Sequence, residues 1–505
     1  MVPSLFFCAL LMQAAPSAAE TGKPAAEKAA EKPSEKEEPP VITHHEIRVN
    51  GKALKYTATA GMMPIHDAKG DTEAHMFFMA YTLDGVSDTG RRPLMFSFNG
   101  GPGSASVWLH LGTLGPRRVV MQPDGQMPSP PFHLVDNEYT WLDQTDLVFI
   151  DPVGTGYSRA TKPELNKNFW NLRGDIRSVG EFIRIYLTRN ERWTSPLFLV
   201  GESYGTTRAA GLSGYLIDRG VAFNGIILVS SILNFQTADF AKGNDLPYIL
   251  YLPSYAATAW YHHKLPPDLQ RDLQKTLKES AAWAETGYAE ALAKGDRLAS
   301  ADRQAVIDRL ARYTGLEKRY IDYSNLRVPI FYFAKELLRD QKRTVGRIDS
   351  RFKGVDESSA TDHPEYDPSL AAIRPPYTST FNNYVRGELG YKTDLEYYIL
   401  GEGITSPWEW GPSSSREGFP DTSDDLRSAL SKNSFMKLFV ASGYFDLATP
   451  YFATEYTLTH MGLDPKLRAN IHTTEYESGH MVYIDLKSLE KLKADVAGFL
   501  NNALK

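Results

Sequence analysis

Cysteine is almost absent from this sequence. The 505 residues include one cysteine, Cys8, which excludes an intramolecular disulfide and a cysteine-based metal cluster. An excess of positive charge is also lacking, since 55 Lys and Arg stand against 61 Asp and Glu. This balance does not favour nucleic acid as a partner. Beyond the N-terminus, no apolar run is long enough for a transmembrane helix, so we expect no stable membrane insertion.

The N-terminus carries a short apolar run, residues 5–12, followed by small residues up to Ala19. This pattern predicts a secretory signal peptide, residues 1–19, with cleavage near Ala19, although no Lys or Arg precedes the run. The alternative is an ordinary apolar N-terminus. Because Cys8 lies inside the run, a lipoprotein signal is disfavoured. We expect a secreted or periplasmic protein that contains no cysteine after cleavage.

Residues 20–40 consist mainly of Ala, Glu, Lys and Pro, without aromatic or branched aliphatic side chains. Such a segment cannot bury enough apolar surface to offset its chain entropy, which predicts a disordered linker. After it, residues 45–50 and 54–59 flank an Asn-Gly turn signal that predicts a β-hairpin. With a third strand at residues 74–83, the pattern indicates an antiparallel edge to a sheet.

Short, nearly continuous apolar runs then recur along the chain, as is typical of strands buried on both faces of a parallel sheet. They are residues 94–98, 147–150, 197–200, 225–229 and 437–441. Residues 175–187 show helical spacing of apolar side chains between two of these runs. Alternating strands and helices predict an α/β fold with a mostly parallel central sheet.

Three of the predicted strands open into glycine-containing loops, at residues 99–103, 151–156 and 201–205. Ligands bind at the carboxyl ends of parallel strands, so these loops are the candidate site. The third loop reads Gly-x-Ser-x-Gly between a strand and a helix. This is the pattern of a nucleophile elbow, in which a tight turn exposes Ser203.

A serine nucleophile needs a base and a group that orients the base. Asp446 follows a predicted strand, and His480 lies in a turn after one further strand-like run, residues 470–474. The order Ser, Asp, His is that of the α/β-hydrolases. The paired histidines 44–45 and 262–263 lack a spaced set of carboxylate partners, so the sequence predicts no metal site and no cofactor.

Four motifs in order resemble the serine carboxypeptidases, peptidase family S10, in a bacterial-type form. They are residues 99–104 (NGGPGS), 151–158 (DPVGTGYS), 201–205 (GESYG) and 479–482 (GHMV). The resemblance implies an α/β-hydrolase fold. It also implies that Ser203 is the nucleophile, His480 the base and Asp446 the orienting acid, with the backbone N–H groups of Gly101 and Tyr204 as the oxyanion hole.

The resemblance further implies that Asn99, with Gly100 in the same loop, and Glu202 bind the free α-carboxylate of a peptide substrate. Two carboxylates approach closely only if one holds a proton. Glu202 must then be protonated, which predicts peptide binding favoured at acidic pH, whereas ester hydrolysis should persist to higher pH. The alternative role for Glu202 is an acid stabilised by a helix N-terminus.

Three departures limit the resemblance to the family pattern. Thr113 stands where family members often have a second acid that pairs with the first, which weakens the carboxylate site. Residues 447–449 after Asp446 lack a familiar cysteine, and Tyr483 stands in place of a usual proline. Eukaryotic relatives carry disulfides, which this chain cannot form, and it has no Asn-x-Ser/Thr sequon. These absences favour a bacterial enzyme.

The chain between Ser203 and Asp446 is far longer than the roughly 30 residues of a βαβ unit. We therefore predict a hydrolase core of residues 41–235 and 431–505, with residues 236–430 inserted as a largely helical cap. Its aromatic side chains could line a substrate pocket or form the core of the cap. Their helical spacing favours the core of the cap. They include Tyr248, Tyr251, Tyr255 and Trp260.

The leading hypothesis is a serine carboxypeptidase that removes C-terminal residues from peptides through an acyl-enzyme. A carboxylesterase or an acyltransferase on the same triad is the first alternative, and Thr113 keeps it open. A catalytically idle binding protein on a hydrolase scaffold is the second, although Ser203, Asp446 and His480 are all present. The oligomeric state stays open, a homodimer included, as does the side-chain preference.

Overall fold

The structure, a computed structural model, describes residues 37–401, 404, 408–410 and 418–505. The predicted signal peptide and nearly all of the predicted linker lie outside these residues. Residues 37–40 are described and form neither helix nor strand. The chain from Glu38 to Lys505 forms one unit, to which all the described helices and strands belong. In its described part, no helix combines the length and the apolar character that a bilayer crossing requires.

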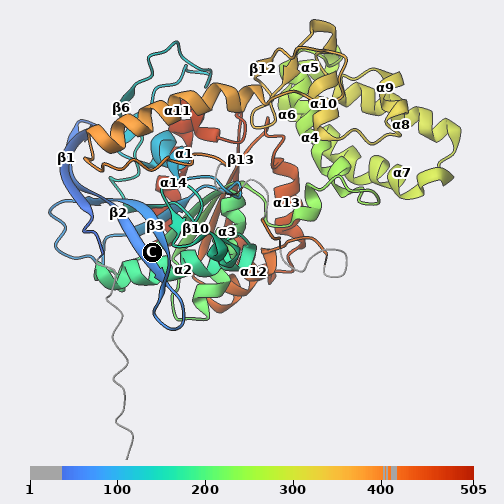
Figure 1. The fold of residues 1–505 in the computed structure, drawn as a ribbon. Helices are drawn as coiled ribbons and strands as arrows, with labels where there is room; N and C mark the ends of the chain where they lie inside the picture. Colours follow the sequence, from blue (N-terminus) through green and yellow to red (C-terminus); the bar gives the residue numbers. More distant parts are fainter. Residues whose placement is uncertain (1–36, 402–403, 405–407, 411–417) are drawn as a thin grey trace, which may run out of the picture. The chain divides into compact units, whose positions relative to one another are not determined.

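A central sheet, with ten strands among the described residues, organises the fold (Figure 1). Its order is β1-β2-β3-β7-β4-β9-β10-β13-β14, with β8 paired to β3. The strands β7 to β14 in this order are parallel, and β1 to β3 add an antiparallel edge. The bounds are β1 Val41–Val49, β2 Lys52–His66, β3 Thr72–Leu83, β4 Leu94–Phe98, β7 Asp146–Ile150, β8 Arg159–Ala160, β9 Leu197–Ser203, β10 Gly225–Ser231, β13 Lys437–Gly443 and β14 Ile471–Tyr476.

The predicted α/β architecture with its mostly parallel sheet is confirmed. The β1–β2 hairpin turns at Asn50 and Gly51, whose positive φ angles of 50° and 77° suit the predicted Asn-Gly turn. Every residue of β4 and β7 is buried, as a strand covered on both faces requires.

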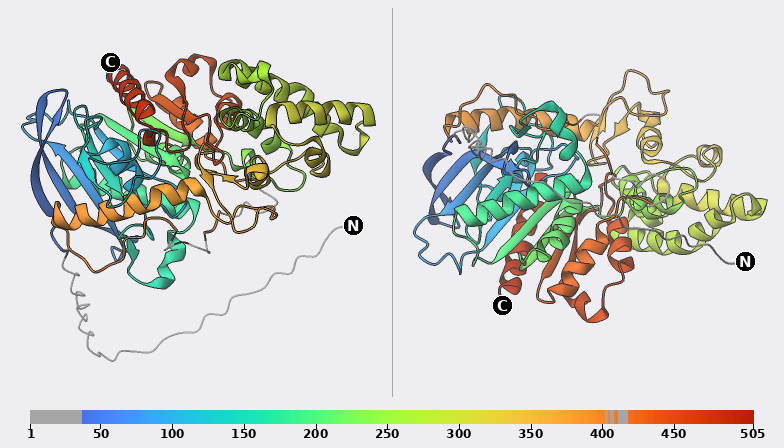
Figure 2. Two further views of the ribbon diagram at one scale, coloured as in Figure 1. Left: turned by 90° about the horizontal axis from the view of Figure 1, so that it is seen from above. Right: turned by 60° about the horizontal axis from the view of Figure 1, so that its bottom comes forward.

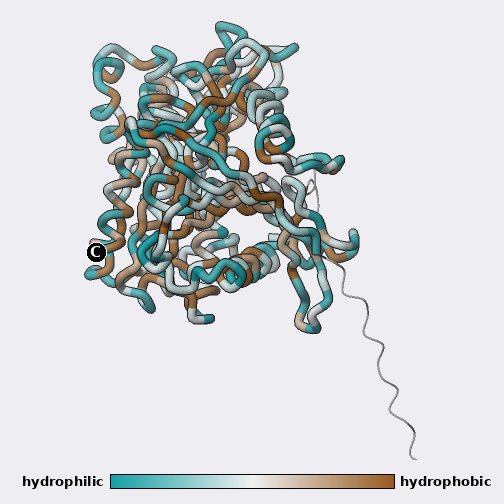
Figure 3. Tube along the Cα trace, turned by 90° about the vertical axis from the view of Figure 1, so that its left-hand side faces the viewer, coloured by the Kyte–Doolittle hydropathy of each residue, from teal (hydrophilic) through white to brown (hydrophobic). Residues whose placement is uncertain are grey.

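Helices cover both faces of the sheet (Figure 2). On one face, α2 (Leu172–Arg189), α3 (Tyr204–Ile217) and α12 (Ser423–Lys432) pack in one hydrophobic cluster. On the other face lie α1 (Val107–Leu109), α11 (Pro368–Gly387) and α14 (Leu486–Ala503). Successive side chains of β9 point to opposite faces of the sheet, so this strand contributes to both hydrophobic clusters. Hydrophilic stretches of chain gather in the peripheral loops (Figure 3).

A group of helices, α4 to α10, forms a separate hydrophobic cluster next to the carboxyl end of β13 (Figure 1). Tyr251 and Tyr255 are buried in this cluster. Neither side chain lines the cavity that lies at the carboxyl ends of the strands, so both belong to the core of the insertion. The bounds are α4 Leu246–Tyr261, α5 Pro267–Gln270, α6 Leu273–Trp283, α7 Ala289–Lys294, α8 Ser300–Thr314, α9 Lys318–Tyr323, α10 Ile330–Glu336 and, after β13, α13 Tyr451–His460.

Helix α11 is not among the predicted elements, because the chain up to Pro376 is polar and contains prolines. The helix begins after Asp367, whose side chain caps it by accepting the N–H groups of Ser369 and Leu370. It continues through Pro375 and Pro376 because its buried face packs over the sheet. The inserted range 236–430 therefore contains a separate helical group, the helix α11 and most of α12, and these last two helices cover the sheet.

Short elements complete the described chain. Two small hairpins are formed by β5 (Arg117–Val119) with β6 (Leu134–Asp136), and by β11 (Thr344–Val345) with β12 (Lys353–Gly354). Single π or 3₁₀ turns are η1 His110–Leu114, η2 Pro163–Asn168, η3 Phe235–Thr237, η4 Ala284–Tyr288, η5 Gly295–Arg297, η6 Arg339–Gln341, η7 Pro465–Asn470 and η8 Val482–Ile484.

Candidate active site

Ser203 lies at the junction of β9 and α3, in a strained conformation. Its φ of 59° and ψ of −132° are unusual for a residue with a side chain. The two flanking glycines make this turn possible, because a Cβ on Gly201 would lie 2.2 Å from the carbonyl oxygen of Gly205, and one on Gly205 2.8 Å from that of Phe98. The local structure is that of the predicted elbow.

Asp446 and His480 follow β13 and β14 and meet beside this turn. The Asp446 Oδ2 lies 2.7 Å from His480 Nδ1. The other carboxylate oxygen accepts the N–H groups of Ala448 at 2.7 Å and Thr449 at 3.0 Å, and the Thr449 hydroxyl donates to Oδ2 at 2.8 Å. These bonds hold a fully buried carboxylate in one orientation.

His480 is fixed through its backbone as well. Its N–H donates to the carbonyl of Ile348 at 2.7 Å, and its own carbonyl accepts the Ser230 hydroxyl at 2.5 Å. Burial by itself lowers the pKa of His480, but the charge of Asp446 and the hydrogen bond to it raise the pKa above its ordinary value. A proton on Nδ1, shared with Asp446, leaves Nε2 as the acceptor.

A cavity of about 290 Å³ lies at the strand ends and is lined by seven of the eight candidate residues, all except the buried Asp446. Ser203 and His480 face it together. Most of its remaining wall is apolar: Trp108, Ile232, Phe235, Ala238, Ile348, Leu370, Ile373, Leu400, Ala448 and Met481.

The backbone of the first glycine loop approaches the start of α3 very closely. A Cβ on Gly100 would lie 2.4 Å from the nitrogen of Tyr204, so only glycine permits this contact. The next residue, Gly101, has a φ of 100° and also lines the cavity. Gly101 and Tyr204, the residues predicted to form the oxyanion hole, therefore line the same cavity as Ser203.

Glu202 and Asn99 form a buried polar pair on this wall. Asn99 Oδ1 accepts the N–H of Leu109 at 3.1 Å, and the Asn99 side chain bonds Glu202 as well. The Tyr483 hydroxyl donates to Glu202 Oε2 at 2.5 Å. Burial raises the pKa of Glu202 to about 7, since it outweighs the lowering by His480 and by the hydrogen bonds from Tyr483 and Asn99.

Comparison with known proteins decides the family. The sequence profile described as serine carboxypeptidase, peptidase family S10, matches residues 50–498. The chain belongs to this family. A crystal structure of KEX1(delta)p, a prohormone-processing carboxypeptidase from Saccharomyces cerevisiae, aligns with a TM-score of 0.52 at 17% identity, over 88% of this chain and 91% of that one. The α/β-hydrolase fold with its helical insertion is thus confirmed.

Curated relatives of plant and fungal origin match shorter segments. Serine carboxypeptidase-like 13 from Arabidopsis thaliana is 28% identical over 174 residues, which cover 32% of this chain and 38% of the relative. Pheromone-processing carboxypeptidase KEX1 from Coprinopsis cinerea is 32% identical over 139 residues, which cover 27% of this chain and 21% of the relative. The chain therefore matches between about a fifth and two fifths of the length of these two relatives.

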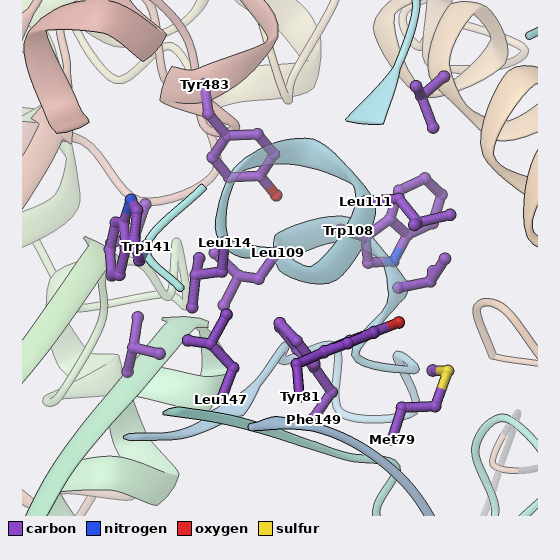
Figure 4. Close-up of a cluster of buried hydrophobic side chains, with 14 of the residues drawn as sticks. Met79, Tyr81, Trp108, Leu109, Leu111, Leu114, Trp141, Leu147, Phe149 and Tyr483 are labelled. Atoms are coloured by element: carbon purple, nitrogen blue, oxygen red, sulfur yellow. The ribbon is translucent and has the colours of Figure 1, made fainter. Parts of the chain in front are cut away.

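Two of the departures from the family pattern, Thr113 and Tyr483, lie next to each other in the structure. Thr113 is buried and does not reach Glu202; its carbonyl accepts the side-chain amide of Asn137. The ring of Tyr483 packs instead against Gly112, where a Cβ would lie 2.3 Å from it. Figure 4 shows this ring in the same buried cluster as Leu111 and Leu114. The hydroxyl of Tyr483 thus supplies Glu202 with the hydrogen-bonding partner that Thr113 does not provide.

Sequence reasoning missed a buried ion pair next to Tyr204 and Asn99. Arg208 Nε donates to Asp175 Oδ2 at 2.8 Å, and the Tyr204 hydroxyl donates to the same oxygen at 2.9 Å. Arg208 also donates to the carbonyl of Asn99 at 2.6 Å. The pair therefore ties α3 to the first glycine loop. No motif marks it, because Asp175 and Arg208 stand on two helices as single charged residues.

The second glycine loop has a supporting role. Asp151 Oδ1 accepts both the N–H and the hydroxyl of Ser106 at 2.8 Å, which anchors the start of α1 beside the first loop. Among the described residues, no group of three His, Cys, Asp or Glu side chains could hold a metal ion.

Proposed function

We propose that the chain is a serine carboxypeptidase that releases C-terminal residues from peptides. Ser203 Oγ attacks the scissile carbonyl carbon while His480 Nε2 takes its proton. The N–H groups of Gly101 and Tyr204 bind the developing oxyanion. His480 then gives the proton to the leaving amine, the C–N bond breaks, and an ester to Ser203 remains. Water, deprotonated by His480, hydrolyses this ester, and the proton returns to Ser203.

The observation that carries this proposal is the buried pair of Asn99 and Glu202 beside Ser203. Both side chains line the cavity, and burial favours the neutral form of Glu202. A neutral carboxyl can donate a hydrogen bond to a substrate carboxylate, whereas an ionised one would repel it. The pair therefore supports selection of a free C-terminus, which an ordinary esterase does not need.

The two titrating groups predict different pH limits for two kinds of substrate. His480 must be neutral to act as a base, which limits both peptide and ester hydrolysis on the acid side. Glu202, with a pKa of about 7, must be protonated to bind a peptide carboxylate, which limits peptide hydrolysis alone on the alkaline side. Peptide hydrolysis should therefore be confined below the pH at which Glu202 ionises, and ester hydrolysis should continue above it.

The test compares a peptide with its C-terminal amide and with a blocked ester. We expect release of the C-terminal residue from the free peptide only, ester hydrolysis at higher pH, and loss of both in Ser203→Ala. Glu202→Gln keeps a hydrogen-bond donor and removes the titration, so its peptide activity should lose the alkaline limit. Equal cleavage of peptide and amide would refute exopeptidase selection and favour a carboxylesterase. Transfer to an acceptor alcohol in preference to water would favour an acyltransferase.

We also propose that the enzyme is a bacterial secreted or periplasmic protein. The short apolar run before Ala19, the single cysteine Cys8 and the absence of glycosylation sequons support this location. Expression of the full chain in a Gram-negative host, followed by fractionation and N-terminal sequencing, tests it. A mature form that begins near residue 20 outside the cytoplasm would agree, and an uncleaved cytoplasmic form would refute the proposal.

A further inference from the structure

One cation lines the cavity at the strand ends. Arg347 belongs to the turn between β11 and β12 and lies in the cavity wall with Ser203, Glu202 and His480. It is half-buried. Glu202 is neutral when it binds a carboxylate, and the rest of the wall is largely apolar. Arg347 is therefore the one permanently charged side chain in this lining, as far as the described residues show.

The guanidinium of Arg347 has no partner in the described part of the chain. No hydrogen bond or ion pair of this group is formed there, in contrast to the neighbouring Arg351, which pairs with Asp349 at 2.7 Å. A cation that is partly withdrawn from water without a counter-charge is costly. The planar guanidinium is suited to bind a carboxylate through two parallel hydrogen bonds.

The backbone around Arg347 is held firmly. The N–H groups of Arg347 and Ile348 donate to Asp367 Oδ2 at 3.2 and 3.1 Å. The carbonyl of Arg347 accepts the N–H of Leu447 at 3.0 Å, and that of Ile348 accepts the N–H of His480 at 2.7 Å. The turn is thus attached to the catalytic histidine by a main-chain bond, which positions the Arg347 side chain relative to the reaction centre.

Arg347 reaches the cavity from the turn between β11 and β12, whereas Asn99 follows β4 and Glu202 belongs to β9. The charge of Arg347 lowers the pKa of His480 and of Tyr251. An α-carboxylate held at Asn99 and Glu202 would leave Arg347 free for a second anionic group. A substrate carries such a group as the side chain of Asp or Glu.

We propose that Arg347 is a specificity-determining residue that binds an acidic side chain of the peptide, on one of the two residues flanking the scissile bond. The inference rests on the proposed carboxypeptidase activity and adds a substrate class to it. Accordingly, peptides with Glu next to the scissile bond should be better substrates than the same peptides with Gln.

The experiment uses three N-blocked peptides: a reference with Gln at the last two positions, and versions with Glu at the last or at the penultimate position. At about pH 6 the substrate Glu is ionised while Glu202 is largely protonated. We expect one Glu peptide to exceed the reference in kcat/KM by roughly ten- to hundredfold. Arg347→Gln should abolish this preference for Glu, and Arg347→Glu should reverse it, so that the Gln reference becomes the better substrate.

Arg343→Gln is the matched control, because it removes the same charge from an exposed residue of the same segment. The neutral reference reports folding and catalysis in every variant. Failure to cleave this reference in the wild-type chain would overturn the proposed function and this inference with it. Normal cleavage with equal Glu and Gln values would overturn the inference alone. Loss of all three peptides in Arg347→Gln, with ester hydrolysis retained, would also overturn it, since Arg347 would then bind the α-carboxylate.

Discussion

The hydrogen bond from Tyr483 to Glu202 sets how readily Glu202 loses its proton. The tyrosine hydroxyl donates to Oε2 at 2.5 Å inside the fold, and this donation stabilises the charged carboxylate. Tyr483→Phe removes the donor and keeps the ring that packs on Gly112. The pKa of Glu202 should then rise above its present value of about 7.

The size of the effect follows from the strength of the lost bond. A hydrogen bond to a charged group contributes about 1.5–3 kcal/mol. Since about 1.4 kcal/mol corresponds to one pKa unit, the pKa of Glu202 should rise by about one to two units. The neutral carboxyl, and with it the binding of a peptide carboxylate, should persist to correspondingly higher pH.

The assay is kcat/KM against pH for a peptide and for its blocked ester. In Tyr483→Phe the alkaline limit of peptide hydrolysis should move up by about one to two pH units, and the ester profile should keep its alkaline side. Tyr377→Phe is the control, because the Tyr377 hydroxyl also lies beside Gly112. An unchanged or lowered peptide limit in Tyr483→Phe, or an equal shift in Tyr377→Phe, would refute the reasoning.

Three further predictions concern the supporting structure. Arg208→Met leaves Asp175 buried without its partner and should lower the free energy of unfolding by about 3–5 kcal/mol in urea titration; an unchanged midpoint would contradict this. Gly100→Ala should displace the Tyr204 nitrogen and reduce kcat about 100-fold for peptide and ester alike, so a loss confined to peptides would count against it. Because burial raises the pKa of Glu202 from 4.5 to about 7, its neutral form stabilises the fold at low pH, and this contribution of roughly 3 kcal/mol is lost as pH rises through that range. Glu202→Gln should show a correspondingly flatter dependence of unfolding free energy on pH, and identical slopes in both proteins would refute this.

The sequence by itself determined the strands of the sheet, the elbow at Ser203 and the order in which Asp446 and His480 follow it. These features are local, because burial on both faces demands short continuous apolar runs and a tight turn demands glycine. Each can be recognised within a window of about ten residues. The same locality explains why α11 was missed, since its two prolines contradict a helix locally and only its packing on the sheet maintains it.

Only the tertiary structure decided how the site is completed. Tyr483 meets Glu202 across 281 residues of sequence, and the turn at Arg347 is joined to His480 through a backbone hydrogen bond from the insertion. Sequence motifs carried no sign of either contact, because a tyrosine or an arginine acquires its role from the group it faces. Burial then sets the chemistry, since the same Glu202 carboxyl would be ionised near neutral pH if water surrounded it.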